Sequence, residues 1–431
     1  MKKFSRIISI CCVFLFAACF FVGCKTVTKK EKKGDEIEYE KYTDTSFVDL
    51  PVVQVVGDMS KISKENKVPV TILYEDANQQ FEQTATIKYQ GATSMMYSKK
   101  NFNIQFMDGE SKKKIKLVDE WGKQSKYCLK ANYVDFSSSR NIVSARVFGE
   151  IVHSRNIDDE VNALVNGGAI DGYPVKLFIN GDYAGIYTMN IPRDKWMFDM
   201  DKTGQKAIIL DDEITTATGF LNKIPENFAG WDVEFCSTED TTGIDWIRTS
   251  FNSFIDFVNE STDEEFVENI GNYTTLDRVI DYMLFVLFIN GKDNLSRNTL
   301  YVTYDGQHWI PSAYDLDGTW GAAWNGFIES ENYYLKLADL PSRNLLWKRV
   351  IENFGAQVKA RYFELRESVL SYDNVTSMFE EFLNEIPEYL LEIERELYVF
   401  RQNTNLNHLE QIKNFVQRNG ARLDAEFEAF E

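Results

Sequence analysis

Cysteine is scarce in this chain of 431 residues, which contains six. Three of them precede Gly23 and a fourth is Cys24, so only Cys128 and Cys236 remain in the rest of the chain. One possible pair is no disulfide framework of the kind that stabilises small secreted domains. Cys128, in the stretch KYCLKA, is typical of a buried strand residue. The fold must therefore depend on a hydrophobic core, for which 44% hydrophobic and 14% aromatic residues are sufficient.

Histidine is rarer still, and its three residues are far apart in the sequence: His153, His308 and His408. A zinc site needs closely spaced histidine and cysteine ligands, and a Ser-His-Asp or Cys-His mechanism needs a histidine beside its nucleophile. The sequence contains neither the ligand spacing nor such an arrangement. We therefore expect neither a zinc site nor a hydrolase of the serine or cysteine type.

Positive charge is in deficit, because 47 Lys and Arg residues face 66 Asp and Glu residues, a formal net charge of −19. Phosphate backbones would be repelled unless a strong local basic patch intervened. No extended patch of this kind is present, and the short run SKKKIK (111–116) is interpreted as an exposed strand end. The composition therefore excludes nucleic acid as a partner.

The N-terminus does contain a long apolar run, which begins after the basic start MKKFSR and ends in FVGC. Residues 1–23 are typical of a secretory signal peptide, and FVGC is typical of a lipoprotein signal whose Cys24 receives the lipid after cleavage. A transmembrane anchor is the alternative, but the run is short for a bilayer span. Residues 24–46 mix charges with few apolar residues, so we expect a flexible tether. The body would lie outside the cytoplasm and contact the membrane only through the lipid.

The remaining 408 residues (431 less 23) change character near residue 200. Residues 47–200 hold mostly strand patterns: VPVTILYED, TATIKYQ, NFNIQF, SKYCLKANY and YPVKLFINGDYAGIYTMNIP, the last with a hairpin turn at NGD. One helix with serine N-cap candidates interrupts them, SSSRNIVSARVFGEIVHSR. Residues 201–431 favour helices, and TTLDRVIDYMLFVLFIN is apolar nearly all round, which predicts burial. The fold class expected is α+β, with a strand-rich N-lobe (47–200), a helical C-lobe (201–431) and a cleft between them.

Four acidic and amide residues follow the apolar helix in an order that indicates chemistry. The loop DNLSRN supplies Asp293 and Asn298, two short strands with a DG turn come next, and YDLDGTWG then supplies Asp315 and Asp317. Phosphoryl-transfer enzymes of the kinase type use this order, in which one carboxylate orients the acceptor hydroxyl while an amide and another carboxylate hold Mg²⁺. The alternative is that these residues only cap a turn and solvate a loop.

Four ordered blocks of the chain resemble the spore coat protein H (CotH) kinase family of divergent secreted or surface-associated protein kinases. They are residues 88–106, 126–145, 181–196 and 293–321. The resemblance spans roughly residues 50–330 and implies a bilobal, divergent protein-kinase-like fold that uses ATP with Mg²⁺, or Mn²⁺ in its place. It implies Asp293 as the catalytic carboxylate, with Asn298 and either Asp315 or Asp317 as metal ligands. The sequence does not distinguish Asp315 from Asp317.

The sequence offers several candidates for the nucleotide-binding residues. The turn QGATS could bind phosphates through Gln90, Gly91, Thr93 and Ser94. The phosphate-pairing lysine could be Lys99 or Lys100 in the first block, or Lys130, which precedes the helix as the kinase strand lysine does. The other candidates are Arg140 and Asn141, which match a family block, Glu150 as a carboxylate partner for the lysine, and residues 188–196 as a hinge for the adenine, with Arg193 and Asp194 interpreted as linker charges.

The sequence is compatible with three functions. The leading hypothesis is a surface lipoprotein that transfers the γ-phosphoryl of ATP to Ser or Thr of an exported, Ser/Thr-rich protein. A kinase-fold scaffold or adhesion module that binds protein or polysaccharide is the alternative, since WDVEF and TWGAAWNGF would allow sugar stacking. A metal-dependent hydrolase is the third. The complete set of Asp293, Asn298 and a downstream Asp favours the kinase, because a pure binder does not need all of them.

Overall fold

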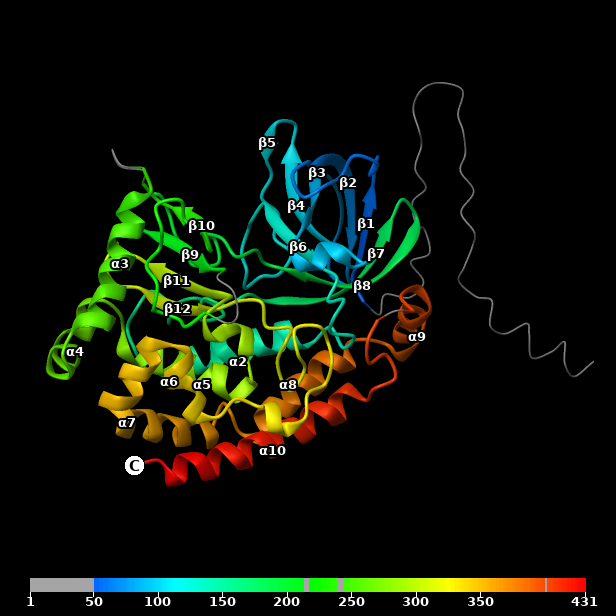
Figure 1. Cartoon of the computed structure of the whole chain (residues 1–431). Helices are drawn as coiled ribbons and strands as arrows, with labels where there is room; N and C mark the ends of the chain where they lie inside the picture. The colour runs from blue at the N-terminus through cyan, green and yellow to red at the C-terminus, as the bar shows by residue number, and fades with distance from the viewer. Residues whose placement is uncertain (1–49, 213–216, 239–242, 400) are drawn as a thin grey trace, which may run out of the picture.

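The computed structural model describes residues 50–212, 217–238, 243–399 and 401–431 (Figure 1). The predicted signal peptide, Cys24 and the predicted tether lie outside the described residues. Within the described part the chain is a mixed α+β protein, with strands gathered in its N-terminal region and helices in its C-terminal region, as the sequence predicts. No helix among the described residues is long and apolar enough to cross a membrane.

The N-terminal region is a barrel of seven strands, in the order β3-β2-β1-β7-β8-β6-β4, which the pairing of β3 with β4 closes. Inward and outward residues alternate along β2, where Val70, Ile72 and Tyr74 are buried between less buried neighbours. Closure leaves no unpaired strand edge in this sheet. The strands are β1 (Val52–Val56), β2 (Val68–Glu75), β3 (Gln80–Gln90), β4 (Asn101–Asp108), β6 (Lys126–Lys130), β7 (Gly172–Ile179) and β8 (Asp182–Asn190), with the short β5 (Ser111–Lys112) extending β4.

The predicted NGD hairpin is confirmed between β7 and β8. Asn180 and Gly181 both have positive φ, at 51° and 87°, as a tight hairpin turn requires. The side chain of Asn180 also accepts a hydrogen bond from the backbone N–H of Gly57, 2.8 Å away, and so ties the turn to the end of β1. The hairpin is therefore fixed to the barrel and not only to itself.

The C-terminal region adds a four-stranded sheet in the order β10-β9-β11-β12, packed with helices (Figure 1). The strands TLYVTY and HWIPSAY predicted by the sequence are β11 (Thr299–Thr303) and β12 (Ile310–Ala313), whereas β9 (Ala207–Asp211) and β10 (Trp231–Cys236) were not predicted. Besides α2, described below, the helices longer than one turn in the described residues are α3 (Asp245–Glu260), α4 (Asp263–Asn269), α5 (Leu276–Ile289), α7 (Leu345–Arg366), α8 (Tyr372–Asn384), α9 (Glu388–Leu397) and α10 (His408–Ala429).

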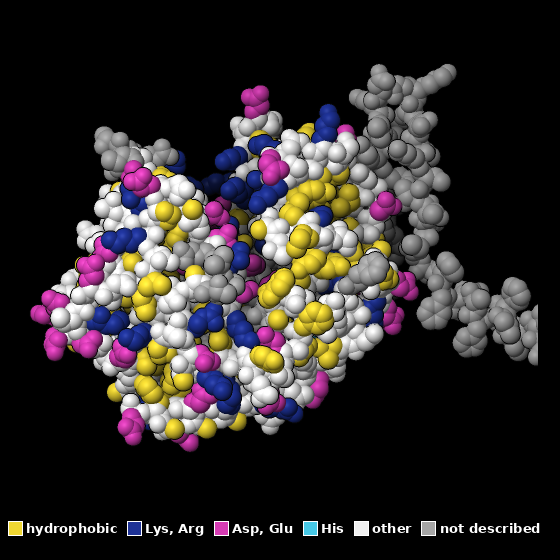
Figure 2. Space-filling model, in the orientation of Figure 1, with side chains coloured by type: hydrophobic (Ala, Val, Ile, Leu, Met, Phe, Trp, Pro, Cys, Tyr) yellow, Lys and Arg dark blue, Asp and Glu magenta, His cyan; other side chains and the backbone are white. Residues whose placement is uncertain are grey.

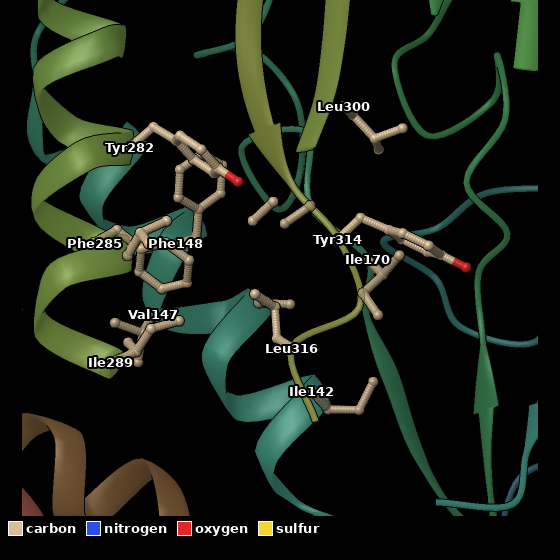
Figure 3. Packing of buried hydrophobic residues seen from close by; sticks show 14 of the residues in the cluster. Ile142, Val147, Phe148, Ile170, Tyr282, Phe285, Ile289, Leu300, Tyr314 and Leu316 are labelled. Carbon is tan, nitrogen blue, oxygen red and sulfur yellow. The ribbon is translucent and has the colours of Figure 1, made fainter. Parts of the chain in front are cut away.

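Helix α2 (Arg140–Ser154) leaves the barrel between β6 and β7 and packs on α5 and α8. Phe148 of α2 meets Phe285 and Tyr282 of α5, with ring centroids 5.1 and 5.9 Å apart (Figure 3). As predicted, α5 is buried nearly all round. The chain after β12 reaches this core through Leu316, which is fully buried. The core of the helical region therefore fixes the segment that carries Asp315 and Asp317.

Ser139 occupies the N-cap position of α2, as the sequence predicts, but its side chain does not cap the helix. None of the serines before Arg140 caps the helix through its side chain, because Ser137 and Ser139 hydrogen-bond to each other instead. The carboxylate of Asp135 accepts a hydrogen bond from the backbone N–H of Arg140, at 2.9 Å, and another from the hydroxyl of Ser137, at 2.6 Å. A carboxylate is the stronger acceptor at a helix start, where backbone N–H groups lack partners.

Candidate functional site

A cleft lies between the barrel and the helical region, where Figure 2 shows a hollow with Lys and Arg side chains at its rim and Asp and Glu side chains deeper inside. Its walls come from four segments: the β3–β4 connection, the end of β6 with the loop after it, the start of α2, and the segment after β12. The lining residues are Ser94, Tyr97, Lys99, Asn101, Lys130, Ala131, Asn132, Tyr133, Val134, Asn141, Asp315 and Asp317.

The loop that carries Asp293 is held by its neighbours. Helix α5 ends where Asn290 adopts a left-handed conformation (φ 58°), and a 3-10 turn, Lys292–Leu295, follows. Lys292 pairs with Glu329 at 2.8 Å, and Arg297 pairs with Asp212 at 2.7 Å. The two cations beside Asp293 are thus engaged elsewhere. The carboxylate of Asp293 itself has no hydrogen bond or ion pair with another described residue and remains available to a substrate.

Asn294 joins the two acidic motifs, a role that sequence reasoning missed. Its amide N–H donates to the carbonyl of Asn298 at 3.2 Å and to the carbonyl of Tyr314 at 2.9 Å. The backbone N–H of Asn298 donates in turn to the carbonyl of Asp211 in β9, at 2.8 Å. The end of the Asp293 loop is therefore fixed beside the residue that precedes Asp315. Asn294 directly follows Asp293 in DNLSRN, and its position in the sequence carried no signal of this contact.

Asp315 and Asp317 are placed by Asn141 and Leu316. Asp315 has a left-handed backbone (φ 55°), and the next N–H, that of Leu316, donates to the side-chain oxygen of Asn141 at 3.0 Å. Leu316 turns into the core, and both aspartates that flank it line the cleft. The side chain of Asn141 therefore holds this segment by the backbone N–H of Leu316. The structure brings Asp315 and Asp317 together at the cleft, as predicted.

Burial and neighbouring carboxylates raise the pKa of Asp293 and of Asp317. Burial, followed by the charge of Asp315, raises the pKa of Asp293, and Lys292 and Arg297 offset this only in part. Burial, followed by Asp315 and Asp135, raises the pKa of Asp317 well above its ordinary range. Burial opposes the charged form of Lys130, but Tyr314 and Asp315 raise its pKa above the usual value. Carboxylates that repel one another without protein partners favour a bound cation.

The donor set fits a hard divalent cation, although no group of three or more His, Cys, Asp and Glu side chains in the described ranges is arranged to hold a metal on its own. Mg²⁺ is usually held by one or two carboxylates, with the remaining positions filled by water and substrate phosphates. Asp315, Asp317 and the amide of Asn298 would supply the protein ligands here. The site would therefore be completed only when a phosphorylated ligand enters the cleft.

The three candidate lysines have different surroundings. Lys99 is buried, with its ammonium 2.6 Å from a carboxylate oxygen of Glu394 in α9, so its charge is already paired. Lys100 donates to the carbonyls of Met95, at 2.6 Å, and Tyr97, and closes the turn before β4. Lys130 lies over the ring of Tyr314, 5.8 Å from its centroid, and faces the aspartates. Lys130 is therefore the lysine best placed to meet a phosphate.

The turn QGATS is only partly brought to the cleft. Gly91 has φ 116°, and a Cβ there would lie 1.9 Å from the hydroxyl oxygen of Ser94, so no other residue fits. Ser94 lines the cleft and its hydroxyl accepts from the amide of Asn101 at 3.2 Å. Gln90, Gly91 and Thr93 do not line it. The turn QGATS therefore contributes one hydroxyl group to the cleft, that of Ser94, and not a ring of hydrogen-bond donors.

Two residues of the α2 block lie away from the ligand. Arg140 is buried outside the cleft, where it pairs with Asp135 and donates to Gln411 at 2.6 Å. Glu150, interpreted as the partner of the phosphate lysine, instead accepts a hydrogen bond from Asn374 of α8 at 2.7 Å. That interpretation is wrong, because Glu150 lies in the last part of a helix whose first residues, not its last, reach the cleft.

The predicted hinge contributes Arg193, which the sequence suggested was a linker charge. Its guanidinium lies 4.4 Å from the ring centroid of Tyr314 and pairs with Glu234 of β10 at 2.7 Å. Asp194 pairs with Lys126 at 3.4 Å. Arg193 therefore lies against Tyr314, the residue before Asp315, and is not one of the residues that line the cleft. Cys128 and Cys236 do not form a disulfide with each other.

His408 supports the far side of Arg140 and gives a stability test. One ring nitrogen lies 3.5 Å from Arg140 and the other 3.0 Å from the carbonyl of Asn403. Burial, followed by the charge of Arg140, lowers the pKa of His408 from 6.5 to about 4. Between these values the unfolded chain binds more protons than the folded one, so folding stability falls as the pH is lowered through this range.

Between pH 7 and pH 5 the free energy of unfolding of the native chain should fall by about 2 kcal/mol more than that of the His408→Gln variant. Urea unfolding at both pH values measures the difference, and His153→Gln, at an exposed position, is the matched control. Parallel pH dependence in the native chain and in His408→Gln would contradict a neutral, buried His408.

The fold and the cleft together define an α+β protein in which unpaired aspartates, an asparagine and a lysine converge at the boundary of a barrel and a helical region, a donor set suited to a metal-bound phosphate ester. The family model "CotH kinase protein" matches residues 87–423. The chain belongs to the CotH kinase family, and the match extends beyond the blocks seen in the sequence into α10. A search of curated proteins finds no match.

Proposed function

We propose that this chain is an extracytoplasmic, membrane-anchored protein kinase that transfers the γ-phosphoryl of ATP to Ser or Thr of exported proteins. The family supports a kinase-like activity. The observation that carries the proposal is that Lys130, Asp315 and Asp317 line one cleft, with Asp293 near enough for its charge to raise the pKa of Asp317. Asn294 holds the backbone of Asn298 beside the same segment. In this reading the barrel is the N-lobe, α2 corresponds to the helix after the lysine strand, and the helical region is the C-lobe.

The residues divide the work of phosphoryl transfer among them. Lys130, on the barrel, would offset phosphate charge. Asp315 and Asp317, with Asn298, would hold Mg²⁺, or Mn²⁺ in its place, which bridges phosphate oxygens and offsets their developing charge. Asp293 would accept or orient the proton of the acceptor hydroxyl, and its raised pKa makes it a stronger base than an ordinary aspartate. Enclosing these groups in a cleft strengthens each interaction by excluding water.

The proposal requires that ATP binding depend on a divalent cation, because three aspartates would otherwise repel a triphosphate. Calorimetry on residues 45–431 is expected to show binding of ATP with Mg²⁺ and little or none in EDTA. Asp315→Ala and Asp317→Ala should each weaken the metal-dependent binding, and the larger loss identifies the principal ligand. Equal affinity with Mg²⁺ and with EDTA would exclude the site.

The proposed location depends on the N-terminus, which lies outside the described residues. Cleavage before Cys24 and lipidation would leave the chain attached to the outer face of the cell membrane, with no membrane contact besides the lipid. We expect the native chain to partition into detergent and its processing to be sensitive to globomycin, whereas Cys24→Ser should block maturation or release the protein. Recovery of the native chain as an unlipidated, soluble species would contradict this.

A further inference from the structure

Helix α9 lies against the barrel strand β8 and carries a buried carboxylate into it (Figure 1). Glu394 is 1% exposed, and one of its oxygens lies 2.6 Å from the ammonium of Lys99. Its other oxygen accepts a hydrogen bond from the backbone N–H of Ile186 at 3.0 Å. Gly185 makes room for this, since a Cβ at that position would lie 2.5 Å from the carboxylate. The barrel is therefore shaped to receive Glu394.

Arg401, which follows α9, connects Glu394 to the cleft. Its guanidinium lies 2.5 Å from Glu394 and donates to the carbonyls of Asn132, Tyr133 and Asp135 at 2.7, 3.0 and 3.1 Å. Asn132 and Tyr133 line the cleft. Asn132 has a left-handed backbone (φ 46°), and its turn is closed by only one backbone hydrogen bond, from Asp135, at 3.1 Å. The carbonyls of Asn132 and Asp135 also accept backbone hydrogen bonds, from Asp135 and Ser138, so Arg401 reinforces these two and gives the carbonyl of Tyr133 its donor.

The planar guanidinium of Arg401 can bind a carboxylate and several carbonyls together, whereas the ammonium of a lysine cannot. Arginine presents five donors in a fixed fork, so it can contact one carboxylate and several carbonyls at once, whereas lysine carries three donors on one atom. Tyr398 adds a second attachment, because its hydroxyl donates to the carbonyl of Ala184 at 2.7 Å. The segment from Glu394 to Arg401 therefore joins the barrel and the cleft loop 132–135 through buried, charge-assisted bonds.

We propose that Arg401, supported by Glu394, is a positioning residue for the nucleotide cleft: by binding the carbonyls of the loop 132–135 it sets the affinity of the cleft for metal-bound ATP. The inference deepens the proposed function and rests on it for the identity of the ligand. Arg401 touches no reacting atom. Its loss should therefore raise KM for ATP and leave kcat nearly unchanged, because Asp293 lies on a different loop.

The experiment compares the mature native chain with Arg401→Lys and Arg361→Lys. Arg361 is the matched control, since it is also buried, pairs with Asp281 at 2.8 Å and donates to the carbonyl of Ile151 at 3.2 Å, but does not line or support the cleft. We measure the Kd of Mg·ATP by calorimetry, KM and kcat, thermal stability, and hydrogen exchange of the amides of residues 131–136 without nucleotide. Glu394→Gln is the second variant should Arg401→Lys fail to fold.

Both arginine variants should lose thermal stability, but only Arg401→Lys should raise the Kd and KM for ATP, by about tenfold or more, with faster exchange in the loop. In Arg401→Gly, added guanidinium should restore affinity. A folded Arg401→Lys with native Kd and native exchange overturns the inference while the proposed function stands. A native chain that binds no Mg·ATP overturns the proposed function and, with it, the claim on affinity.

Discussion

Replacing Asp293 by alanine is expected to slow phosphoryl transfer by about 10²–10⁴-fold, the usual cost of losing a positioned general base. The affinity for Mg·ATP should stay nearly unchanged, because Asp293 is assigned to the acceptor hydroxyl and not to the phosphates or the metal. Burial and Asp315 raise its pKa, so the acid limb of the native pH–rate profile should lie above the usual range of an aspartate. Transfer from γ-labelled ATP to a Ser/Thr-rich protein acceptor, or to the chain itself, measures the rate.

Asp315→Ala and Asp317→Ala are the comparison for Asp293→Ala, since a metal ligand should lose affinity and rate together. Thermal melts establish that each variant is folded. Asp212→Ala is the matched acidic control, because Asp212 pairs with Arg297 of the same loop, does not line the cleft and has no assigned role in the transfer. Undiminished transfer in Asp293→Ala would refute the assignment of DNLSRN. A native chain that binds nucleotide but transfers nothing would favour the scaffold hypothesis.

Local patterns predicted the parts of the structure that local forces determine. Alternating burial in β2, the NGD hairpin and the nearly all-round burial of α5 depend on neighbours within a few residues, and all three are confirmed. The order of Asp293, Asn298, Asp315 and Asp317 was also readable, because they follow one helix and a single hairpin separates the two pairs. Short connections leave few ways to separate such residues in space.

Contacts between distant segments could not be read in this way. Closure of the barrel depends on the register of β3 with β4 and on β1 pairing in parallel with β7, more than a hundred residues later. The partner of Lys99 is Glu394, 295 residues away. Glu150 was expected to pair with the phosphate lysine, because it lies on the helix that follows a candidate lysine strand. Its carboxylate is instead bound by Asn374 of α8. Such choices depend on the packing of whole elements, for which one sequence carries no local signal.

Methionine substitutions should distinguish Lys130 from Lys99, two candidates for the phosphate-pairing lysine that the sequence does not separate. Lys130→Met should weaken Mg·ATP binding and slow transfer by about 10²-fold or more, as loss of one charge-stabilising donor commonly does. Its effect on stability should be small, since Lys130 forms no ion pair with another described residue. Calorimetry and the transfer assay measure the first effect, and urea unfolding measures the second.

Lys99→Met should have the opposite signature and destabilise the fold by about 3 kcal/mol or more, because it leaves the buried Glu394 without one of its two cations. Burial lowers the pKa of Lys99 to about 8 even though Glu394 raises it, so the buried charge of Lys99 depends on this partner. Adding Glu394→Gln to Lys99→Met should therefore recover part of the loss, since the pair is removed together. If Lys99→Met remained as stable as the native chain but lost nucleotide binding, while Lys130→Met kept both, the roles of the two lysines would be reversed, and the phosphates would lie on the α9 side of the cleft.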